Sequence, residues 1–253
     1  MDHSLEKSPT TSSEEFHLPE QLKGYRCWAA SHRGLVRAEN EDAFAVSSSS
    51  AESDQWDGLI PSADGWAFIA DGMGGHAGGK VASRLAIECL KDLSDMLGDQ
   101  DGIEAALAAI HQSMFSAMRK DTASWGMGTT VAGVILSADE ALCFNVGDSR
   151  IYHMGSRLSL VSEDHVVNGN MLTQCLGGTS ELNVPESSFV RVLWKRGQRL
   201  LLCTDGLTDM VDENDIAAIL ERERQSPAEA LISAALRAGG KDNVTAIVLE
   251  HLG

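Results

Sequence analysis

A glycine-rich stretch constrains this chain more than any other. It runs from Asp71 to Gly79 and holds five glycines between a predicted strand at 66–70 and a helix expected from Lys80. So many glycines let the backbone turn sharply and pass close to a small charged group. Asp71, at the expected strand end beside bare carbonyls, suits a hard cation better than a phosphate. The P-loop pattern is absent. Taken alone, the stretch could also be a plain glycine-rich connector.

The composition excludes some classes of function. The 253 residues, 43% of them hydrophobic, are enough for a sizeable core. A net charge of −17 argues against a nucleic-acid surface, which needs clustered Lys and Arg. Some of this acid could belong to a metal site, although a solvated acidic surface explains most of it. We expect no nucleic-acid partner.

The cysteines and the apolar runs bear on location. The five cysteines are scattered, without a Cys-x-x-Cys pair: Cys27, Cys89, Cys143, Cys175 and Cys203. They suit reduced, buried thiols and offer no zinc site. No stretch approaches the roughly 20 apolar residues of a membrane helix, and the N-terminus lacks an apolar signal core. We therefore expect a cytoplasmic protein with no membrane insertion.

The hydrophobic periodicity predicts an α+β fold. Residues 1–20 have little to bury and are expected to be a disordered tail, followed by a single domain over 21–253. Strands are expected at 25–32, 43–47, 129–136, 141–146, 150–154, 189–194, 199–203 and 244–249, with those from 129 to 154 forming an antiparallel meander. Apolar stripes over 82–97 and 103–118 indicate two helices, and two more follow Asp212 and Ser226. Such grouping favours two antiparallel sheets packed together with helix pairs outside, an α-β-β-α sandwich.

Three local features carry further expectations. Residues 47–53 form a serine-rich loop, expected to be a disordered hairpin connection. His111 lies at the edge of the second apolar stripe and is most simply a surface residue. Ser226, Pro227 and Glu229 predict a capping box at the start of the last helix.

Five aspartates share one local setting, the junction between an apolar run and a turn: Asp42, Asp71, Asp148, Asp205 and Asp242. A single such residue is more often a turn former or a helix cap. If the five converge, they form an all-oxygen pocket suited to Mg²⁺ or Mn²⁺. Two ions there could hold a bridging hydroxide and neutralise an anionic substrate.

Five short motifs give the chain a family resemblance. In order they are Gly34-x-Val36-Arg37-x-x-Asn40-Glu41-Asp42, Asp71-Gly72-Met73-Gly74-Gly75-His76, Gly128-Thr129-Thr130, Gly147-Asp148-Ser149-Arg150, and Asp205-Gly206-Leu207 with a later Asp242-Asn243. Together they resemble the metal-dependent serine/threonine protein phosphatases of type 2C, particularly the bacterial members. The resemblance extends from about residue 25 to residue 249.

The resemblance implies a binuclear metal centre between the sheets. Its ligands would be Asp42, Asp71, Asp205 and Asp242, with the Gly72 carbonyl and, through water, Glu41. Asp148 with Asp205 would supply a third, weaker position. The ions would be Mn²⁺ or Mg²⁺, and no organic cofactor is implied.

Two further residues match catalytic positions of the family. Arg37 matches the arginine that grips the substrate phosphate, a role that suits a bidentate guanidinium. His76 matches the proposed general acid, which protonates the departing seryl or threonyl oxygen. Without the resemblance, the favoured interpretation of His76 is a loop histidine hydrogen-bonded to backbone.

The implied activity is hydrolysis of phosphoserine and phosphothreonine monoesters in proteins. A hydroxide bridging the two ions would attack phosphorus directly, since no Ser-His-Asp or Cys-x5-Arg arrangement indicates a covalent intermediate. The enzyme would be a monomer opposing a bacterial serine/threonine kinase. One alternative is a pseudophosphatase that only binds phosphoproteins, although such proteins typically lose metal aspartates. Another is a phosphatase of anti-sigma-factor antagonists, which would usually carry sensor domains.

The chain departs from the family in one segment. Relatives carry a long flap after the Asp164-His165 pair, whereas here Leu176-Gly177 follows after only ten residues. Because the flap lies beside the active site in relatives, its loss bears on substrate preference and on the third metal position.

Overall fold

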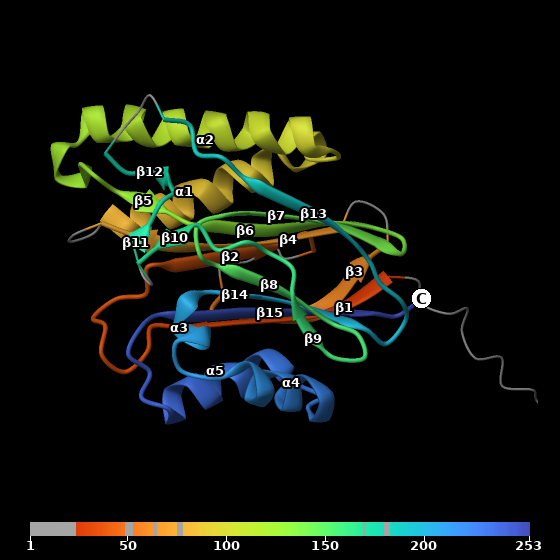
Figure 1. Ribbon diagram of the computed structural model, residues 1–253. Coiled ribbons are helices and arrows are strands. Elements are labelled where there is room, and N and C mark those ends of the chain that lie inside the picture. Colours follow the sequence, from red (N-terminus) through yellow and green to blue (C-terminus); the bar gives the residue numbers. More distant parts are fainter. Residues whose placement is uncertain (1–23, 49–52, 63–64, 75–77, 169–170, 180–182) are drawn as a thin grey trace, which may run out of the picture.

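The computed structural model describes residues 24–48, 53–62, 65–74, 78–168, 171–179 and 183–253. They form four layers, in which two packed sheets lie between helices on either outer face (Figure 1). This arrangement confirms the predicted α-β-β-α sandwich. The predicted tail at 1–20 and most of the serine-rich loop lie outside the described residues.

The first sheet contains both ends of the described chain. Its spatial order is β3 (Gln55–Pro61), β1 (Gly24–His32), β15 (Val244–His251), β14 (Arg199–Cys203), β8 (Arg150–Met154) and β9 (Leu158–Leu160). Every neighbouring pair is antiparallel. The helices α3 (Asp205–Thr208), α4 (Glu213–Arg222) and α5 (Pro227–Arg237) lie on its outer side (Figure 1).

The second sheet contains the strand that runs into the glycine-rich stretch. Its order is β12 (Leu176–Gly177), β5 (Gly128–Thr129), β4 (Gly65–Met73), β6 (Val131–Ser137), β7 (Glu140–Val146) and β13 (Ser188–Leu193), with β2 (Asp42–Val46) paired to β4. The helices α1 (Gly78–Asp92) and α2 (Gln100–Lys120) cover it, and short 3-10 turns lie at Ser94–Met96 and Thr122–Ser124. A separate hairpin joins β10 (Val166–Val167) to β11 (Met171–Leu172).

Three apolar layers hold the sandwich together. Residues such as Ile69, Leu202 and Ile247 fill the space between the sheets, and all three are fully buried. Two further clusters lie between each sheet and its helices. Since β14 is buried on both faces, its continuous apolar run at 200–203 is typical of a central strand. This core fixes the strand ends that carry the aspartates.

The connection after β7 corrects the predicted meander. β6 and β7 pair in the second sheet, whereas β8 pairs with β14 in the first. The chain therefore crosses between the sheets at 147–149, because Gly147, with φ of 105°, redirects it there. The crossing places Asp148 between the two sheets.

Several other expectations were wrong or incomplete. His111 is 1% exposed, not a surface residue, and its Nδ1 accepts a hydrogen bond from the Gly177 amide at 3.1 Å. Ser226 caps α5 without a side-chain hydrogen bond, and its amide donates to Glu223 Oε1 at 3.3 Å, so the predicted capping box is absent. β4 continues to Met73, so Asp71 lies within the strand, not after it.

Other elements match or were missed. Asp212 caps α4 by accepting from the Asp215 amide at 2.9 Å, as its position in the sequence predicts. β3 and the four-residue α3 were not predicted. Among the described residues, no helix is long and apolar enough to span a bilayer.

Candidate active site

A cavity of about 830 Å³ opens at the end of the sandwich where β4 meets β5 and where β11 lies nearby. Seven residues predicted for the site line it: Arg37, Glu41, Asp71, Gly72, Asp148, Asp205 and Asp242. They come from five separate segments of the chain. The predicted convergence of acidic side chains on one pocket is therefore present, although Asp42 is not among the lining residues.

Asp42 lies behind the cavity and links the two sheets. Its backbone pairs with that of Asp71 in the β2–β4 register. Its Oδ2 accepts hydrogen bonds from Thr204 Oγ1 at 3.0 Å and from Thr245 Oγ1 at 2.7 Å. Thr245 belongs to β15 of the opposite sheet, and Thr204 directly follows β14 of that sheet. Its Oδ1 is buried and has no hydrogen-bond partner in the described structure. The direct ligand role assigned to Asp42 stays a prediction.

The Gly128-Thr129-Thr130 motif holds the backbone of Asp71. The Asp71 carbonyl accepts from the Thr130 amide at 2.9 Å and from Thr129 Oγ1 at 2.8 Å. The Asp71 amide donates to Thr130 Oγ1 at 3.1 Å. Thr130 Oγ1 also shares a 2.7 Å hydrogen bond with Ser149 Oγ, next to Asp148. The two threonines thus couple the positions of two acidic side chains.

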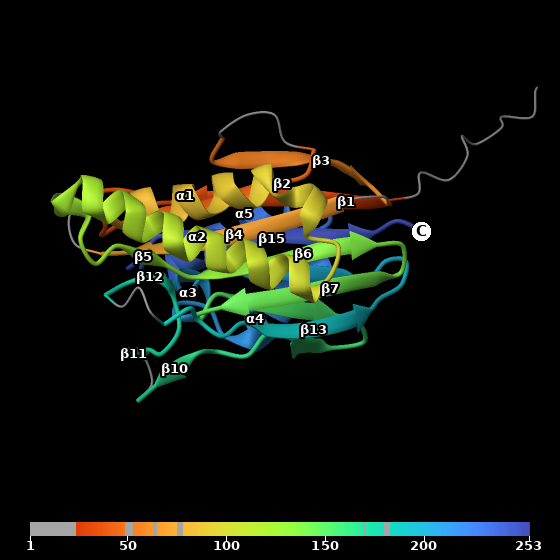
Figure 2. The ribbon, with the colours of Figure 1, turned by 90° about the horizontal axis from the view of Figure 1, so that it is seen from above.

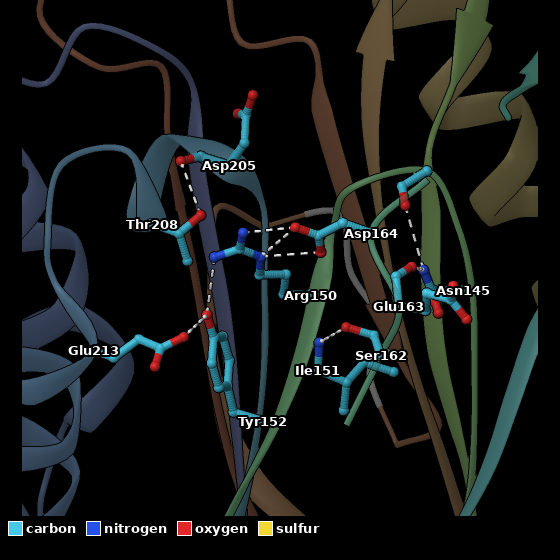
Figure 3. A network of polar contacts seen from close by, with 11 residues as sticks. Asn145, Arg150, Ile151, Tyr152, Ser162, Glu163, Asp164, Asp205, Thr208 and Glu213 are labelled. Atoms are coloured by element: carbon cyan, nitrogen blue, oxygen red, sulfur yellow. Dashed lines mark hydrogen bonds and ion pairs between the residues drawn. The ribbon is translucent and has the colours of Figure 1, made fainter. Parts of the chain in front are cut away.

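A second network fixes the loop of Asp148 (Figure 3). The Arg150 guanidinium forks onto both oxygens of Asp164, at 2.6 to 3.0 Å, and donates to the Tyr152 hydroxyl at 3.2 Å. Tyr152 in turn donates to Glu213 at 3.2 Å. His165 Nδ1 accepts from the Gly147 amide at 3.1 Å. These contacts connect the segment 147–150 to the Asp164-His165 pair, so each segment holds the other in position.

Asn243 holds the loop that carries Arg37 and Glu41. Its Oδ1 accepts from the Glu41 amide at 2.8 Å, and its Nδ2 donates to the Arg33 and Glu39 carbonyls at 2.9 and 2.8 Å. The sequence placed Asn243 in a motif without assigning this role. Buried side chains that satisfy three backbone groups are costly to remove.

Two glycines of the motifs are required by close approach. Gly34 has φ of 79°, and a β-carbon there would collide with the Asp242 carbonyl. A β-carbon on Gly72 would collide with the carbonyls of Gly79 and Glu41. Both sites therefore exclude any side chain. The bare backbone at Gly72 borders the cavity, where its carbonyl could reach a cation.

Arg37 lies at the mouth of the cavity and already has a carboxylate partner. Its Nη2 donates to Asp242 Oδ2 at 2.6 Å, and its side chain is 53% exposed. Asp242 raises the pKa of this guanidinium, through the hydrogen bond first and its charge second. A phosphate bound here would share Arg37 with Asp242 or replace it.

The acidic side chains destabilise one another's charges. Burial first, and neighbouring carboxylates second, raise the pKa of Asp71 well above its ordinary value. Burial raises the pKa of Asp42 to about 7, although its two threonine hydrogen bonds oppose this, and raises that of Asp205 to about 6. Burial also raises the pKa of Asp148 and of Glu41. A cation among these groups would favour their charged forms.

The chemistry of the donors fits a hard divalent cation. All candidate donors are carboxylate or carbonyl oxygens, the ligands that Mg²⁺ and Mn²⁺ prefer. Asp205 Oδ1, like Asp42 Oδ1, is buried without a hydrogen-bond partner in the described structure. Among the described residues, no group of three or more His, Cys, Asp or Glu side chains already has the geometry of a metal site. Small side-chain movements would have to complete it.

The remaining predicted residue, His76, lies outside the described residues, so its role as general acid stays a prediction. Reasoning from sequence quoted Thr130, Ser149 and Asn243 in motifs but missed their positioning roles, and it missed the roles of Thr204 and Thr245 as well. Only the recurrence of Thr and Asn beside the aspartate motifs could have indicated them.

Comparison with known proteins agrees with this geometry. A sequence model of protein phosphatase 2C matches residues 40–238. The serine/threonine protein phosphatase PstP of Mycobacterium tuberculosis is 32% identical over 88% of this chain and 44% of its own length. The serine/threonine phosphatase stp of Listeria monocytogenes is 31% identical over 87% of this chain and 93% of its own. The crystal structure of the PstP catalytic domain with two manganese ions has a TM-score of 0.75 and 29% identity, covering 90% of this chain and all of that one.

This chain thus spans less than half the length of the mycobacterial relative, but nearly all of the listerial one. The family match covers most of the residues that line the cavity. On the joint basis of motifs, fold and site, the chain belongs to the protein phosphatase 2C family.

Proposed function

We propose that this protein is a Mn²⁺- or Mg²⁺-dependent phosphatase of phosphoserine and phosphothreonine in proteins. The observation that carries the proposal is the meeting of Glu41, Asp71, Asp148, Asp205 and Asp242 with Arg37 in one cavity. These residues come from distant segments, and only the fold brings them together. Carboxylates that suit cations, beside an arginine that suits a phosphate, match phosphoryl chemistry.

Asp71, Asp205 and Asp242 would hold two cations, with the Gly72 carbonyl and Glu41 completing the set. Asp42 would join them as a ligand through its unpartnered Oδ1, and Asp148 would serve a third position. When bound, such cations neutralise phosphoryl charge and lower the pKa of water enough to supply a nucleophile.

The protein's own groups would orient the substrate and move its protons. Arg37 would bind two phosphoryl oxygens through its planar fork. Asn243 would hold the loop that carries Arg37 through its hydrogen bonds to the backbones of residues 33, 39 and 41. Thr130 would hold the backbone of Asp71. His76 would give a proton to the departing seryl or threonyl oxygen.

The relatives support the substrate class, since PstP and stp are both named serine/threonine phosphatases. We propose further that the enzyme opposes a bacterial serine/threonine kinase and acts as a monomer in the cytoplasm. The five cysteines are free thiols, as a reducing compartment requires. The acidic composition supports the absence of a nucleic-acid partner.

The test is phosphate release from a phosphothreonine peptide, with and without Mn²⁺. Wild-type activity should depend on Mn²⁺ or Mg²⁺ and disappear in EDTA. Asp205→Asn should lose activity by several powers of ten, whereas Asp95→Asn, on the exposed turn after α1, should not. Undiminished hydrolysis in excess chelator would contradict the proposal.

A further inference from the structure

Several exposed apolar side chains belong to chain segments that adjoin the cavity. Four of the six most exposed large apolar side chains in the described residues belong to this group, which we call the apolar rim: Leu35, Val36, Trp125 and Met171. They are between 62% and 69% exposed. The other two, Met96 and Leu193, do not border the cavity. Scattered apolar residues need no explanation, but a group around one opening does.

Each member of the rim adjoins a segment that borders the cavity. Val36 precedes Arg37, and Met171 precedes Leu172, and both Arg37 and Leu172 line the cavity. Trp125 precedes Gly126, which packs beside the cavity residue Gly74. The connection from β1 to β2, the β10–β11 hairpin and β5 lie toward the same end of the sandwich (Figures 1 and 2).

The positions of the rim residues are fixed by backbone contacts. The Leu35 amide donates to the Gly240 carbonyl at 2.7 Å, which holds Leu35 and Val36 at the opening. The pairing of Val166 with Leu172 and of Val167 with Met171 holds the hairpin. Two of the three segments that carry the rim are therefore held by backbone hydrogen bonds, which lowers the entropic cost of binding.

The rim cannot serve the phosphate itself, because charged and polar groups line the cavity and are the natural partners of phosphate. A ligand whose phosphate enters the cavity must place its neighbouring residues on the rim. Resting on the proposed function, we propose that the apolar rim binds large apolar side chains flanking the phosphorylated residue of the substrate protein. The rim gives the site a preference that the cavity cannot provide.

The test compares two phosphothreonine peptides of equal length and charge, with Mn²⁺ present. One carries Leu or Phe on both sides of the phosphothreonine, and the other carries Ser and Asn there. We expect wild-type kcat/KM to favour the apolar peptide about fivefold to tenfold, and tenfold equals about 1.4 kcal/mol. The double variant Val36→Thr with Met171→Gln, which keeps side-chain size, should reduce the ratio below about twofold.

Met96→Gln is the matched control, because it makes the same change in an equally exposed Met away from the cavity. It should keep the wild-type ratio. Because the readout is a ratio of two substrates on one enzyme, a loss of folded protein does not alter it.

Three results would overturn the inference. The first is an equal kcat/KM for the two peptides, and the second is a wild-type ratio that persists in the double variant. The third is a specific activity that falls as the wild-type enzyme concentration rises, but does not fall in the double variant. The last would mean that a second copy of the chain covers the rim. Hydrolysis of the polar peptide tests the proposed function separately, since its absence would refute that function and not merely the preference.

Discussion

Asp205 should destabilise the metal-free protein at neutral pH. Burial, with the nearby charges of Asp148 and Asp242, raises the pKa of Asp205 from 3.8 to about 6. A carboxyl whose pKa is higher in the folded state favours folding at low pH. This advantage is lost as the pH rises from about 3.8 to about 6. Above that range the difference corresponds to about 3 kcal/mol of destabilisation.

Asp205→Asn removes this charge with little change of shape. Asp205 Oδ1 has no hydrogen-bond partner among the described residues, so the substitution breaks no hydrogen bond at that oxygen. Because Asp205 is partly exposed and loses a hydrogen bond with Asp71, we expect a gain of about 2 kcal/mol in the free energy of unfolding. In a domain of this size that corresponds to a rise in Tm of about 4–8 °C.

Manganese should reverse this order. At a hundred times its Kd, a bound ion stabilises the wild-type protein by about 2.7 kcal/mol, whereas the variant gains little. Thermal unfolding in EDTA and in saturating Mn²⁺, at about pH 7.5, measures both effects. Near pH 4.5 the difference between the metal-free proteins should shrink below about 1 kcal/mol. A variant that melts below wild type in EDTA at neutral pH, or that gains as much from Mn²⁺, would refute the reasoning.

Three further changes give distinct expected results. Arg37→Ala should raise KM for a phosphopeptide by about tenfold to a hundredfold, and by more than it lowers kcat, because Arg37 binds phosphate similarly in the ground and transition states. Steady-state kinetics, with Arg37→Lys as the intermediate variant, measures this change, and an unchanged KM would indicate a structural role instead. Asn243→Ala should lower the free energy of unfolding by about 2–3 kcal/mol, because three backbone partners are lost; urea denaturation in EDTA measures this, and a loss below about 0.5 kcal/mol would contradict it. Arg199→Met should cost about 3–5 kcal/mol, since the 2% exposed guanidinium binds Glu250 and the carbonyls of Leu220 and Glu223 at the end of α4; calorimetry would contradict this if Tm stayed unchanged.

Much of the fold could be predicted because its strands are buried on both faces. The run at 200–203 is apolar and continuous, and β14 has the predicted bounds, Arg199–Cys203. β3 was missed because it is an edge strand whose side chains are mostly exposed, so it lacks an apolar pattern. α3 was missed because four residues cannot show helical periodicity. The position of β8 was wrong because alternation does not reveal which sheet a strand joins.

The site, like the fold, could be predicted where its signals are local and could not where they depend on tertiary contacts. The motifs predicted which carboxylates meet, because glycines and aspartates at strand ends are local signals. The contacts that hold them are not local. Thr130 and Ser149 lie 19 residues apart, and Asn243 reaches Glu41 across 202 residues. No pattern in the sequence indicated that Asp42 would turn toward Thr204 and Thr245 behind the cavity.

The burial of His111 illustrates a limit of periodicity. A histidine at the edge of an apolar stripe can face either the core or the solvent. The Gly177 amide, 66 residues away, supplies the hydrogen bond that makes its burial tolerable. Partners of this kind are decided by tertiary structure, so reasoning from the helix alone gave the wrong answer.

The stoichiometry of Mn²⁺ binding tests the central claim most directly, namely that these carboxylates form a binuclear centre. Equilibrium dialysis followed by elemental analysis, on wild type, Asp71→Asn and the surface control Asp95→Asn, measures it without relying on activity. The account predicts about two tightly bound ions per chain in wild type and in the control. It predicts loss of both ions in Asp71→Asn, because the Asp71 carboxylate interacts electrostatically with those of Asp42, Asp148, Asp205 and Asp242. Wild-type protein that binds no Mn²⁺, or an Asp71→Asn variant that binds as much as wild type, would contradict it.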